Sequence, residues 1–403
     1  MQVLLPYCLS IPDHSFYQNF HLGLTEALHE LGHEAVTLSC ATLGQSTQEE
    51  AAALLHRLAS GRVGAVLDLA CWGFGLSRTD FLNPENGRQQ AMFEAFEVPY
   101  MGMLFDHPYN QAINVIRARR AYAVYPDLGH SELLRMSFPG LRLHGEIFSP
   151  PGIRPGNDRS AASWSERDID VLYVGNLAPV ALERSWLKPL PDGQRRHPFQ
   201  PVVTNAIVNA ALAHPERSLH SSVAEAIKQF GRLPHGLSLQ QCLQEGEGFL
   251  RNVFRRDAVT ALARSGVRMR VVGRGWDSIS LPANVELDAV IDYEGIFRLA
   301  GRAKICLDAS TYFDGVNDRA FNYALNGAVC FTNAAGYLRG GFGEQNGMRF
   351  YSMHRLAELG DQVKTLLSQP DVLREAGERA RQTVLASHTW RHRVENMLNE
   401  MTR

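Results

Sequence analysis

Short apolar runs alternate with longer amphipathic stretches through the first third of the chain. The apolar runs lie at residues 3–8, 35–40, 65–71, 100–106 and 122–125. After the first run, an apolar stripe with helical spacing is formed by Phe16, Phe20, Leu24, Leu28 and Leu31. Gly32 follows this stripe and predicts the end of the helix. Strands that alternate with helices predict a parallel sheet with helices on both faces.

A second series of the same kind follows a loop rich in Pro, Gly and Ser at residues 149–165. Its apolar runs lie at residues 169–174, 267–272, 285–291, 305–309 and 329–332. A mostly helical or loop-like stretch interrupts the series before an amphipathic helix that begins at Phe249 and is capped by Gly266. The chain ends in helical patterns near 354–367, 371–385 and 388–401.

These patterns predict two doubly wound α/β domains. The predicted boundaries are a first domain at 1–150, a linker at 151–165, a second domain at 166–385 with a helical insertion at about 179–249, and a C-terminal helix at 386–403. Two such domains in series predict a cleft between the carboxyl ends of two sheets, where loops and helix N-termini converge on a ligand.

Composition narrows the class of protein. Of the 403 residues 45% are hydrophobic, and the formal net charge is −2. The hydrophobic content excludes wholesale disorder, and the balanced charge excludes a general nucleic-acid binder, which would carry a basic excess. Six scattered cysteines without a CxxC pair favour buried thiols in a reducing compartment. The N-terminus is typical of a core strand, and no run approaches the roughly 20 apolar residues of a spanning helix. We therefore expect a cytoplasmic protein, with contact to the inner face of the membrane as the peripheral alternative.

The loop at 311–318 precedes a predicted helix that begins near Asp318. A helix N-terminus after a flexible loop can bind a diphosphate through free backbone N–H groups. Arg319 lies in the first turn, where the helix dipole disfavours a cation, so an anionic ligand would explain it. A surface ion pair with Asp314 or Asp318 is the alternative.

The segment at 267–333 resembles the C-terminal half of the CgeB-like (spore maturation) glycosyltransferases. The resemblance rests on the turn GRGW at 273–276, on VELDAVIDYEGIFRLAGRAKICLDAS and GVNDRAFNYALNGAVCFTN after it, and on the ending SHTWRHRVENML. It covers about residues 166–400, whereas the first domain matches by general pattern only. The resemblance implies the GT-B fold, in which two Rossmann-like domains face a cleft, and an enzyme that uses a sugar nucleotide.

The resemblance also implies donor-binding residues. Related GT-B enzymes often carry two glutamates seven residues apart, one for the transferred sugar and one for the ribose. Asp314 and Asn322 stand at these positions, so the ribose position has lost its charge. The implied donor-binding set is Gly175, Asn176, Gly273, Gly275, Trp276, Asp314, Gly315, Asn317, Arg319 and Asn322.

The side chains that would supply positive charge to the phosphates are less easily assigned. Many relatives place an Arg and a Lys after the first strand of this domain, and neither follows Gly175 and Asn176. Arg319, or an arginine from the pair Arg255 and Arg256, is the candidate replacement. For Arg255 and Arg256, a solvated helix face is the favoured interpretation.

The first domain supplies the other candidates. Asp106 and His107 lie at the end of a predicted strand, where Pro108 stops it, and suit a general base or a contact to the donor sugar. A capping Asp and a hydrogen-bonded core His are the structural alternative. Asp13 and His14 lie in the first loop and are the candidate acceptor contacts, although Asp also suits a helix N-cap.

Three other motifs favour structural roles. His29 and His33 match HExxH, but Gly32 stands where the helix should end, which would separate the two histidines. The DxD motif at 168–170 precedes a strand, so we expect a polar strand entry. Gly273 and Gly275 form only a partial dinucleotide fingerprint, because its third glycine is missing. We expect no metal site.

The predicted reaction moves a sugar from a nucleoside diphosphate to a hydroxyl of a glycan, lipid-linked or protein acceptor. It needs no metal and no cofactor beyond the sugar nucleotide, since helix N–H groups and Arg neutralise the leaving group. The alternatives are a non-catalytic sugar- or nucleotide-binding scaffold of the same fold and a nicotinamide-dependent oxidoreductase.

Overall fold

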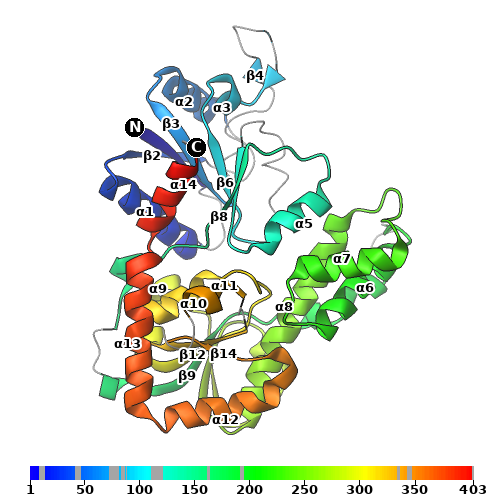
Figure 1. The fold of residues 1–403 in the computed structure, drawn as a ribbon, viewed down its shortest axis with the longest axis vertical. Coiled ribbons are helices and arrows are strands. Elements are labelled where there is room, and N and C mark those ends of the chain that lie inside the picture. Colours follow the sequence, from blue (N-terminus) through cyan, green and yellow to red (C-terminus); the bar gives the residue numbers. More distant parts are fainter. Residues whose placement is uncertain are drawn as a thin grey trace. The chain divides into compact units, whose positions relative to one another are not determined.

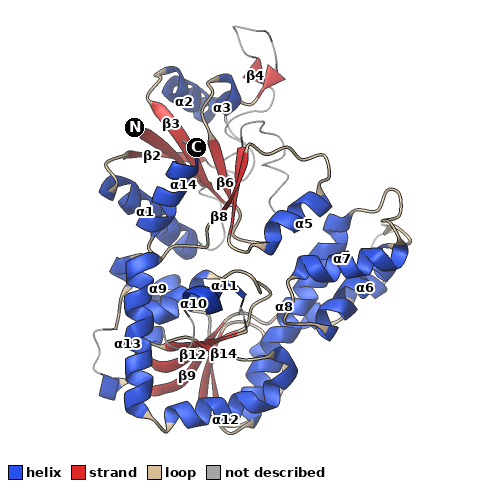
Figure 2. Cartoon of the chain, viewed as in Figure 1, coloured by secondary structure: helices blue, strands red, loops and turns tan. Residues whose placement is uncertain are grey.

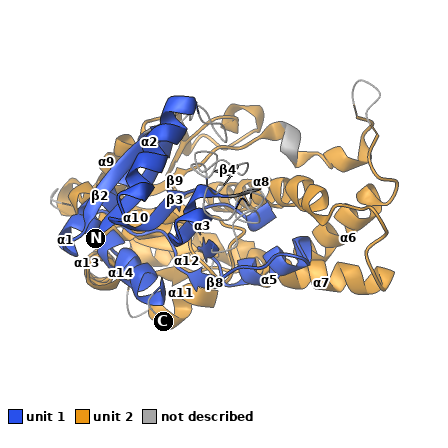
Figure 3. Cartoon of the chain, turned by 90° about the horizontal axis from the view of Figure 1, so that it is seen from above, with its two compact units in different colours: residues 1–154, 389–403 blue, residues 155–388 orange. Residues whose placement is uncertain are grey.

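The computed structural model describes residues 1–8, 14–40, 47–71, 81–82, 87, 89–109, 121–160, 164–190, 195–333, 336–342 and 347–401. These residues form two compact units (Figures 1 and 3). One unit is Met1–Arg154 together with Thr389–Arg403, and the other is Pro155–His388. The last helix, α14 (Trp390–Met401), is therefore part of the first unit, although the second unit precedes it in the sequence.

The first unit contains a six-stranded sheet in the order β2-β1-β3-β6-β7-β8, with all neighbours parallel (Figure 2). Its strands are β1 (Gln2–Cys8), β2 (Glu34–Cys40), β3 (Val63–Leu69), β6 (Tyr100–Met103), β7 (Ala121–Tyr125) and β8 (Gly145–Phe148). The described helices besides α14 are α1 (His14–Glu30), α2 (Gln48–Ala59), α3 (Met92–Ala95) and α5 (Gly129–Ser137). A separate antiparallel pair joins β4 (Phe81–Leu82) and β5 (Gln89–Gln90).

The second unit contains a parallel sheet in the order β11-β10-β9-β12-β13-β14. Its strands are β9 (Ile169–Val174), β10 (Met269–Val272), β11 (Val285–Asp288), β12 (Ala303–Asp308), β13 (Val329–Thr332) and β14 (Arg349–Phe350). The described α-helices are α6 (Gln200–Ala213), α7 (Leu219–Phe230), α8 (Leu239–Arg264), α9 (Tyr293–Arg302), α10 (Asp318–Leu325), α11 (Gly336–Gly341), α12 (Leu356–Leu367) and α13 (Pro370–Ser387). Short 3-10 turns include η5 (Ser185–Leu187) and η7 (Trp276–Ser278).

The predicted class, two Rossmann-like doubly wound α/β domains, is confirmed by these two sheets. In the second unit α8 and α12 pack together on one face, over alternate residues of the central strands such as Val171, Ile305 and Leu307. On the opposite face, α9 and α10 contact β12. Layers of this kind bury both faces of a parallel sheet, which is why its strands are continuously apolar.

The expected buried thiols are also found. Among the described side chains, the free cysteines Cys8, Cys71, Cys242, Cys306 and Cys330 are all buried. Four of them lie on or beside strands, where a small thiol packs well.

Several predicted boundaries were wrong for identifiable reasons. The strand predicted at 65–71 ends at Leu69, because Ala70 and Cys71 adopt left-handed φ values of 59° and 56°. The strand predicted to reach residue 106 ends at Met103. Helix α8 begins at Leu239, capped by Ser238, rather than at Phe249. Its first turns carry Leu239, Cys242 and Leu243 at helical spacing, but the segment EGEG at 245–248 interrupts this apolar stripe before Phe249.

Candidate functional site

In the second sheet, the strands after β9 are added first on one side of it (β10, β11) and then on the other (β12, β13, β14). The order of the strands therefore reverses between β9 and β12, which are neighbours at the centre of the sheet. In open α/β sheets, ligands bind beyond the carboxyl ends of the strands at such a switch point. Four loops of this unit follow those ends: Gly175 and Asn176 after β9, Gly273 to Trp276 after β10, Ala309 to Thr311 after β12, and Asn333 after β13. This edge includes most of the predicted donor-binding residues.

The glycine turn after β10 interlocks with the loop after β9. Trp276 Nε1 donates to the Gly175 carbonyl at 2.7 Å, and the Arg274 amide donates to Asn176 Oδ1 at 2.9 Å. Gly275 has a φ of 82°, and a Cβ atom there would lie 2.0 Å from the Leu177 carbonyl oxygen. Only glycine therefore fits. Trp276 is 1% exposed, so its ring belongs to the core and holds the turn.

Asp308, at the end of β12, organises the entry to α10. It is 1% exposed and accepts hydrogen bonds from Asn317 Nδ2 at 3.0 Å and from Thr332 Oγ1 at 3.0 Å. Arg319 Nη2 lies 3.4 Å from Asp308 Oδ1. Burial lowers the pKa of Arg319, but the Asp308 carboxylate, together with smaller effects of Tyr323, Tyr173 and Asp318, raises the net pKa. The alternative interpretation, a surface ion pair with Asp314 or Asp318, is not what the structure shows, because the ion-pair partner of Arg319 is Asp308.

Helix α10 begins at Asp318 as predicted, but its first N–H groups have another partner than the expected diphosphate. Asn317 is the N-cap, and its side chain accepts hydrogen bonds from the amides of Arg319 and Ala320. The sequence predicted that free N–H groups at this helix start bind a diphosphate. These two N–H groups are not free for that role, because Asn317 already accepts their hydrogen bonds. The guanidinium groups beside this helix are the better candidates for binding an anion.

Arg255 was expected on a solvated helix face, and this expectation was wrong. Helix α8 carries it to the carboxyl edge, where its Nη1 donates to the Asn176 carbonyl at 2.9 Å. Its Nε is enclosed and has no hydrogen-bond partner among the described residues. Burial lowers the pKa of Arg255, and the nearby cations of Arg319 and Arg251 lower it further. The next residue, Arg256, does lie on the solvated face, paired with Asp257 at 2.7 Å.

Two carboxylates form ion pairs with the other arginines of this cluster, whereas Arg255 is attracted by Glu247 without a direct ion pair. Glu247 binds Arg251 through two contacts of 2.8 Å, and Asp308 is the partner of Arg319. No carboxylate of the described residues forms an ion pair with Arg255. A half-buried cation of this kind is stabilised when an anion binds beside it.

Tyr173, the penultimate residue of β9, lies in the same cluster. Its hydroxyl is buried and has no hydrogen-bond partner among the described residues. Burial raises the pKa of Tyr173, while the positive charges of Arg255 and Arg319 lower it. A Cβ atom on Gly175 would lie 2.9 Å from this hydroxyl, so Gly175 keeps the space above it open. The hydroxyl is therefore a donor or acceptor available at the end of β9.

Asn322, the predicted ribose contact, is 4% exposed. Its Nδ2 donates to the Tyr293 hydroxyl at 3.1 Å and to the Asp318 carbonyl at 2.9 Å. Tyr293 in turn donates to the Asp318 carboxylate, whose pKa is raised by burial. The Asn322 Oδ1 is buried and has no hydrogen-bond partner among the described residues, so it can accept a hydrogen bond from a ligand.

Asp314 and Gly315 lie in the loop between β12 and α10. Asp314 is half-buried, and Gly315 is buried. A Cβ atom on Gly336 would lie 2.2 Å from Asp314 Oδ1, and the Gly336 amide donates to the Phe313 carbonyl at 2.9 Å. The loop is therefore packed against the start of α11, and only a glycine at 336 allows this approach.

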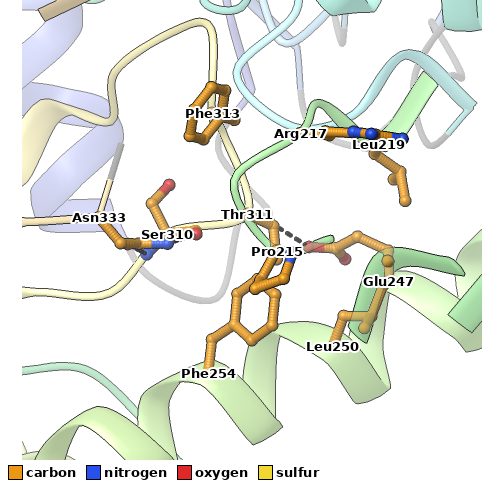
Figure 4. A pocket seen from close by; sticks show the side chains of 11 residues that line it. Pro215, Arg217, Leu219, Glu247, Leu250, Phe254, Ser310, Thr311, Phe313 and Asn333 are labelled. Atoms are coloured by element: carbon orange, nitrogen blue, oxygen red, sulfur yellow. Dashed lines mark hydrogen bonds between the residues drawn. The ribbon is translucent and has the colours of Figure 1, made fainter. Parts of the chain in front are cut away.

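A pocket at this edge also uses the helical insertion (Figure 4). Its lining residues are Ala211, Pro215, Arg217, Leu219, Glu247, Leu250, Phe254, Ser310, Thr311, Phe313 and Asn333. Thr311 Oγ1 donates to Glu247 Oε1 at 2.8 Å, which joins α8 to the loop after β12. Sequence analysis assigned no role to Glu247, because nothing in a long polar helix start distinguishes it from a solvated glutamate.

The first unit holds the two predicted candidates for a base. His107 is 1% exposed, and its ring lies 4.7 Å from that of His130 and 5.4 Å from that of Tyr109. Asp106 is half-buried. Both follow the end of β6, at the carboxyl edge of the first sheet. Asp13 lies outside the described residues; His14 begins α1, and its side chain is likewise outside them.

The metal-like motifs have other partners. Helix α1 ends at Glu30 and Gly32 adopts a φ of 77°, so His33 leaves the helix before β2 begins. Asp168 pairs with Arg302, and Asp170 pairs with Lys304 at 2.6 Å. The described side chains include no group of three or more His, Cys, Asp or Glu placed to hold a metal. Within the same part of the chain, no helix is long and apolar enough to cross a membrane.

Comparison with known proteins places this site in a fold of known type. Residues 251–399 match a family described as glycosyl transferase-like. The chain aligns with an α-glucosyltransferase in complex with UDP-glucose and DNA containing an abasic site, at 11% identity over 100% of both chains, with a TM-score of 0.54. It aligns with sucrose-phosphate synthase from Thermosynechococcus elongatus at 10% identity, over 100% of this chain and 98% of that one, with a TM-score of 0.52.

An Anabaena protein, HepE, in complex with UDP and glucose has 9% identity over 100% of this chain and 99% of that one, with a TM-score of 0.52. No curated protein matches the sequence. At these identities the structural likeness shows the fold alone. The chain therefore has the two-domain α/β fold of the GT-B glycosyltransferases, and its residues 251–399 carry the pattern of a glycosyl transferase-like family.

Proposed function

We propose that this chain transfers a sugar from a nucleoside diphosphate to an acceptor hydroxyl. The glycosyl transferase-like segment begins at residue 251 and includes Arg255, Asp308 and Arg319. Structural neighbours of the same fold are described in complex with UDP-glucose or with UDP and glucose. Both facts favour a nucleotide sugar as the donor.

The observation that carries this proposal is the uncompensated charge of Arg255. Its guanidinium is half-buried at the end of β9, bonded to a backbone carbonyl, attracted by Glu247 without a direct ion pair, and repelled by two other arginines. A diphosphate would supply the missing negative charge and accept hydrogen bonds from Arg255 and Arg319. Asp308 would then orient Arg319 without a direct contact to the donor.

In the proposed reaction, the bond between the sugar C1 and the diphosphate oxygen breaks, and a bond from C1 to the acceptor oxygen forms. The acceptor proton passes to a base, and the nucleoside diphosphate leaves with the negative charge that Arg255 and Arg319 stabilise. The proposed base is Asp106 or His107, and the proposed contact of Asp314 is to the sugar hydroxyls. These last roles rest on the sequence and on its resemblance to related enzymes.

The first experiment measures binding of UDP, GDP, CDP, TDP, ADP and NADH by thermal shift and calorimetry. One diphosphate should stabilise the folded protein, since a ligand that binds only the native state raises its melting temperature. Arg255→Ala should weaken that binding about 10- to 100-fold, because a charge-assisted hydrogen bond contributes about 1.5–3 kcal/mol. Arg256→Ala is the matched control and should bind normally, since Arg256 pairs on the solvated face.

Equal binding by both variants would contradict the proposed site. A shift with NADH alone would favour an oxidoreductase. Binding of a diphosphate without hydrolysis or transfer of any sugar would favour the non-catalytic scaffold. We also propose that turnover needs no divalent cation, and loss of activity in EDTA with recovery in magnesium would refute that point.

A further inference from the structure

Exposed apolar side chains gather in one stretch of the second unit. Nine large hydrophobic side chains of the described residues are exposed, and three of them lie between residues 187 and 202. Leu187 is 59% exposed, Phe199 is 51% exposed and Val202 is 52% exposed. Single exposed apolar residues are ordinary, but a cluster marks a surface that another body covers.

Two of these side chains share one face of α6, and a hydrogen bond links the turn of Leu187 to the start of that helix. Phe199 and Val202 are three residues apart at the start of α6, a spacing that places them on the same helix face. Arg196 Nη1 donates to the Lys188 carbonyl at 2.6 Å and so ties the residue after Leu187 to the entry of α6. We call Leu187, Lys188, Arg195, Phe199 and Val202 the insertion patch.

The turn that carries Leu187 is held in place by the packing of its neighbour Trp186 against α8. Trp186, next to Leu187, is 1% exposed, and its ring lies 5.4 Å from that of Phe249 in α8. Leu187 is therefore exposed because its neighbour fills the core, and not because the turn η5 is loosely packed. A firmly held turn presents an apolar side chain at small entropic cost.

The sequence around the patch carries more basic than acidic side chains, although Arg196 is already paired with Glu245 of α8 at 2.6 Å. Residues 183–202 contain four basic side chains, Arg184, Lys188, Arg195 and Arg196, against Glu183 and Asp192, whereas the chain has 40 Lys and Arg against 42 Asp and Glu. Arg195 is exposed, and Lys188 is 61% exposed in its pair with Glu183. An exposed pair of this kind is weak, so Lys188 can interact with another anion.

A second exposed apolar pair shows that charge distinguishes the patch. Leu287 and Val290 are each 44% exposed on the same unit. The residues from 286 to 294 carry Glu286, Asp288, Asp292 and Glu294 and no Lys or Arg. Each of these carboxylates pairs with an arginine, Arg270, Arg298 or Arg159, so this surface combines similar apolar exposure with balanced charge.

We propose that the insertion patch binds the anionic surface of a lipid membrane. Apolar side chains can enter the boundary between head groups and acyl chains while Lys188 and Arg195 contact acidic head groups. Charge complementarity favours this occupant over a neutral membrane. The proposal does not depend on glycosyl transfer, because vesicle binding is measured without any sugar nucleotide.

The test is co-sedimentation of the full chain with phosphatidylcholine vesicles and with vesicles that also contain phosphatidylglycerol. The chain should bind only the anionic vesicles, and less at higher ionic strength, because salt screens exposed charges. Replacing Leu187, Phe199 and Val202 by Ser together should weaken binding about tenfold or more, since it removes three apolar contacts. The double change Leu287→Ser with Val290→Ser is the control and should bind as the parent chain does.

Unchanged vesicle binding by the triple variant, or an equal loss in the control, would overturn the proposal. Binding that ignores both lipid charge and salt would also overturn it. If the chain dimerises without vesicles, and the triple variant abolishes that dimer but never binds lipid, the patch contacts a second copy instead. Circular dichroism melting should show that the variants fold normally, because all the changed side chains are exposed.

Discussion

Gly275 and Gly266 have nearly the same backbone conformation, with φ values of 82° and 84°, but different surroundings. A Cβ atom on Gly275 would meet the Leu177 carbonyl at 2.0 Å, whereas one on Gly266 would meet nothing within 4 Å. The left-handed conformation by itself costs an L-residue about 1–2 kcal/mol. A comparison of substitutions at the two positions therefore separates the cost of backbone strain from the cost of steric contact.

We predict that Gly275→Ala destabilises the protein by about 1–3 kcal/mol more than Gly266→Ala, because it must also displace the loop after β9. Thermal unfolding followed by circular dichroism measures the difference. Gly275→Ala should also weaken nucleoside diphosphate binding, since Asn176 lies in the displaced loop. Equal melting temperatures for the two variants would contradict the interlocked turns.

His21 gives the first unit a dependence on pH. Its side chain is buried beside Thr37 and Tyr7, and burial lowers its pKa from 6.5 to about 4, against the opposing effect of a hydrogen bond to the Leu5 backbone. The unfolded chain therefore takes up the proton first as the pH falls. The contribution of His21 to stability is complete above pH 6.5, decreases between pH 6.5 and about 4, and is lost below that range.

We predict that this decrease amounts to about 3 kcal/mol, from the size of the pKa shift. His21→Gln should flatten the profile between those pH values, because a neutral amide does not titrate. Urea denaturation at a series of pH values measures it. His29→Gln, an exposed histidine on the same helix, is the control and should leave the slope unchanged.

At the scale of elements, α14 completes the first unit from the far end of the sequence. Its Trp390 is 2% exposed, and the ring lies 5.2 Å from that of Phe20 in α1. The Trp390 amide also donates to the Ile153 carbonyl at 3.1 Å. A Cβ atom on Gly23 would lie 2.1 Å from the indole, so α1 and α14 meet at a glycine.

We predict that Trp390→Ala destabilises the first unit by about 3–5 kcal/mol, the usual cost of emptying a large aromatic site. Arg391→Ala changes an exposed neighbour on the same helix and should cost less than about 0.5 kcal/mol. Chemical denaturation of both variants gives the comparison. A small effect of Trp390→Ala would mean that α14 is dispensable to the first unit.

At the scale of the whole molecule, the proposed donor site belongs to one unit. All of its described contacts, from Gly175 to Arg319, lie within Pro155–His388. A nucleoside diphosphate at 100 times its dissociation constant would stabilise the state that binds it by about 2.7 kcal/mol. That stabilisation should slow hydrogen exchange in the unit that binds the ligand.

We predict that hydrogen exchange slows on diphosphate binding in residues 169–176, 249–276 and 305–333. Peptides from β1, β3 and α2 in the first unit should exchange at the same rate with and without the ligand, since none of the proposed donor contacts lies there. Mass spectrometry resolves these peptides. Slower exchange in the first unit alone would mean that the donor site lies there, and would contradict the predicted site in the second unit.

The sequence alone determined the fold class and most of the strands, because two-sided burial in a parallel sheet requires continuous apolar runs that are visible without a structure. It also located the glycine turn and the start of α10, since caps and turns depend on near neighbours. The edge strands β8 and β14 were missed, because neither is a continuous apolar run: β8 begins with Gly and Glu, and β14 has only two residues, of which one is an arginine.

Only the tertiary structure decided which charges meet. Arg319 pairs with Asp308 rather than with its sequence neighbours, and Arg255 lies at the carboxyl edge whereas Arg256 faces solvent. Adjacent residues on a helix point in directions about a quarter-turn apart, so a sequence cannot show which of two arginines reaches the site until the helix is packed. Likewise, Glu247 and Trp390 contact residues far away in the chain, and such contacts depend on the fold as a whole.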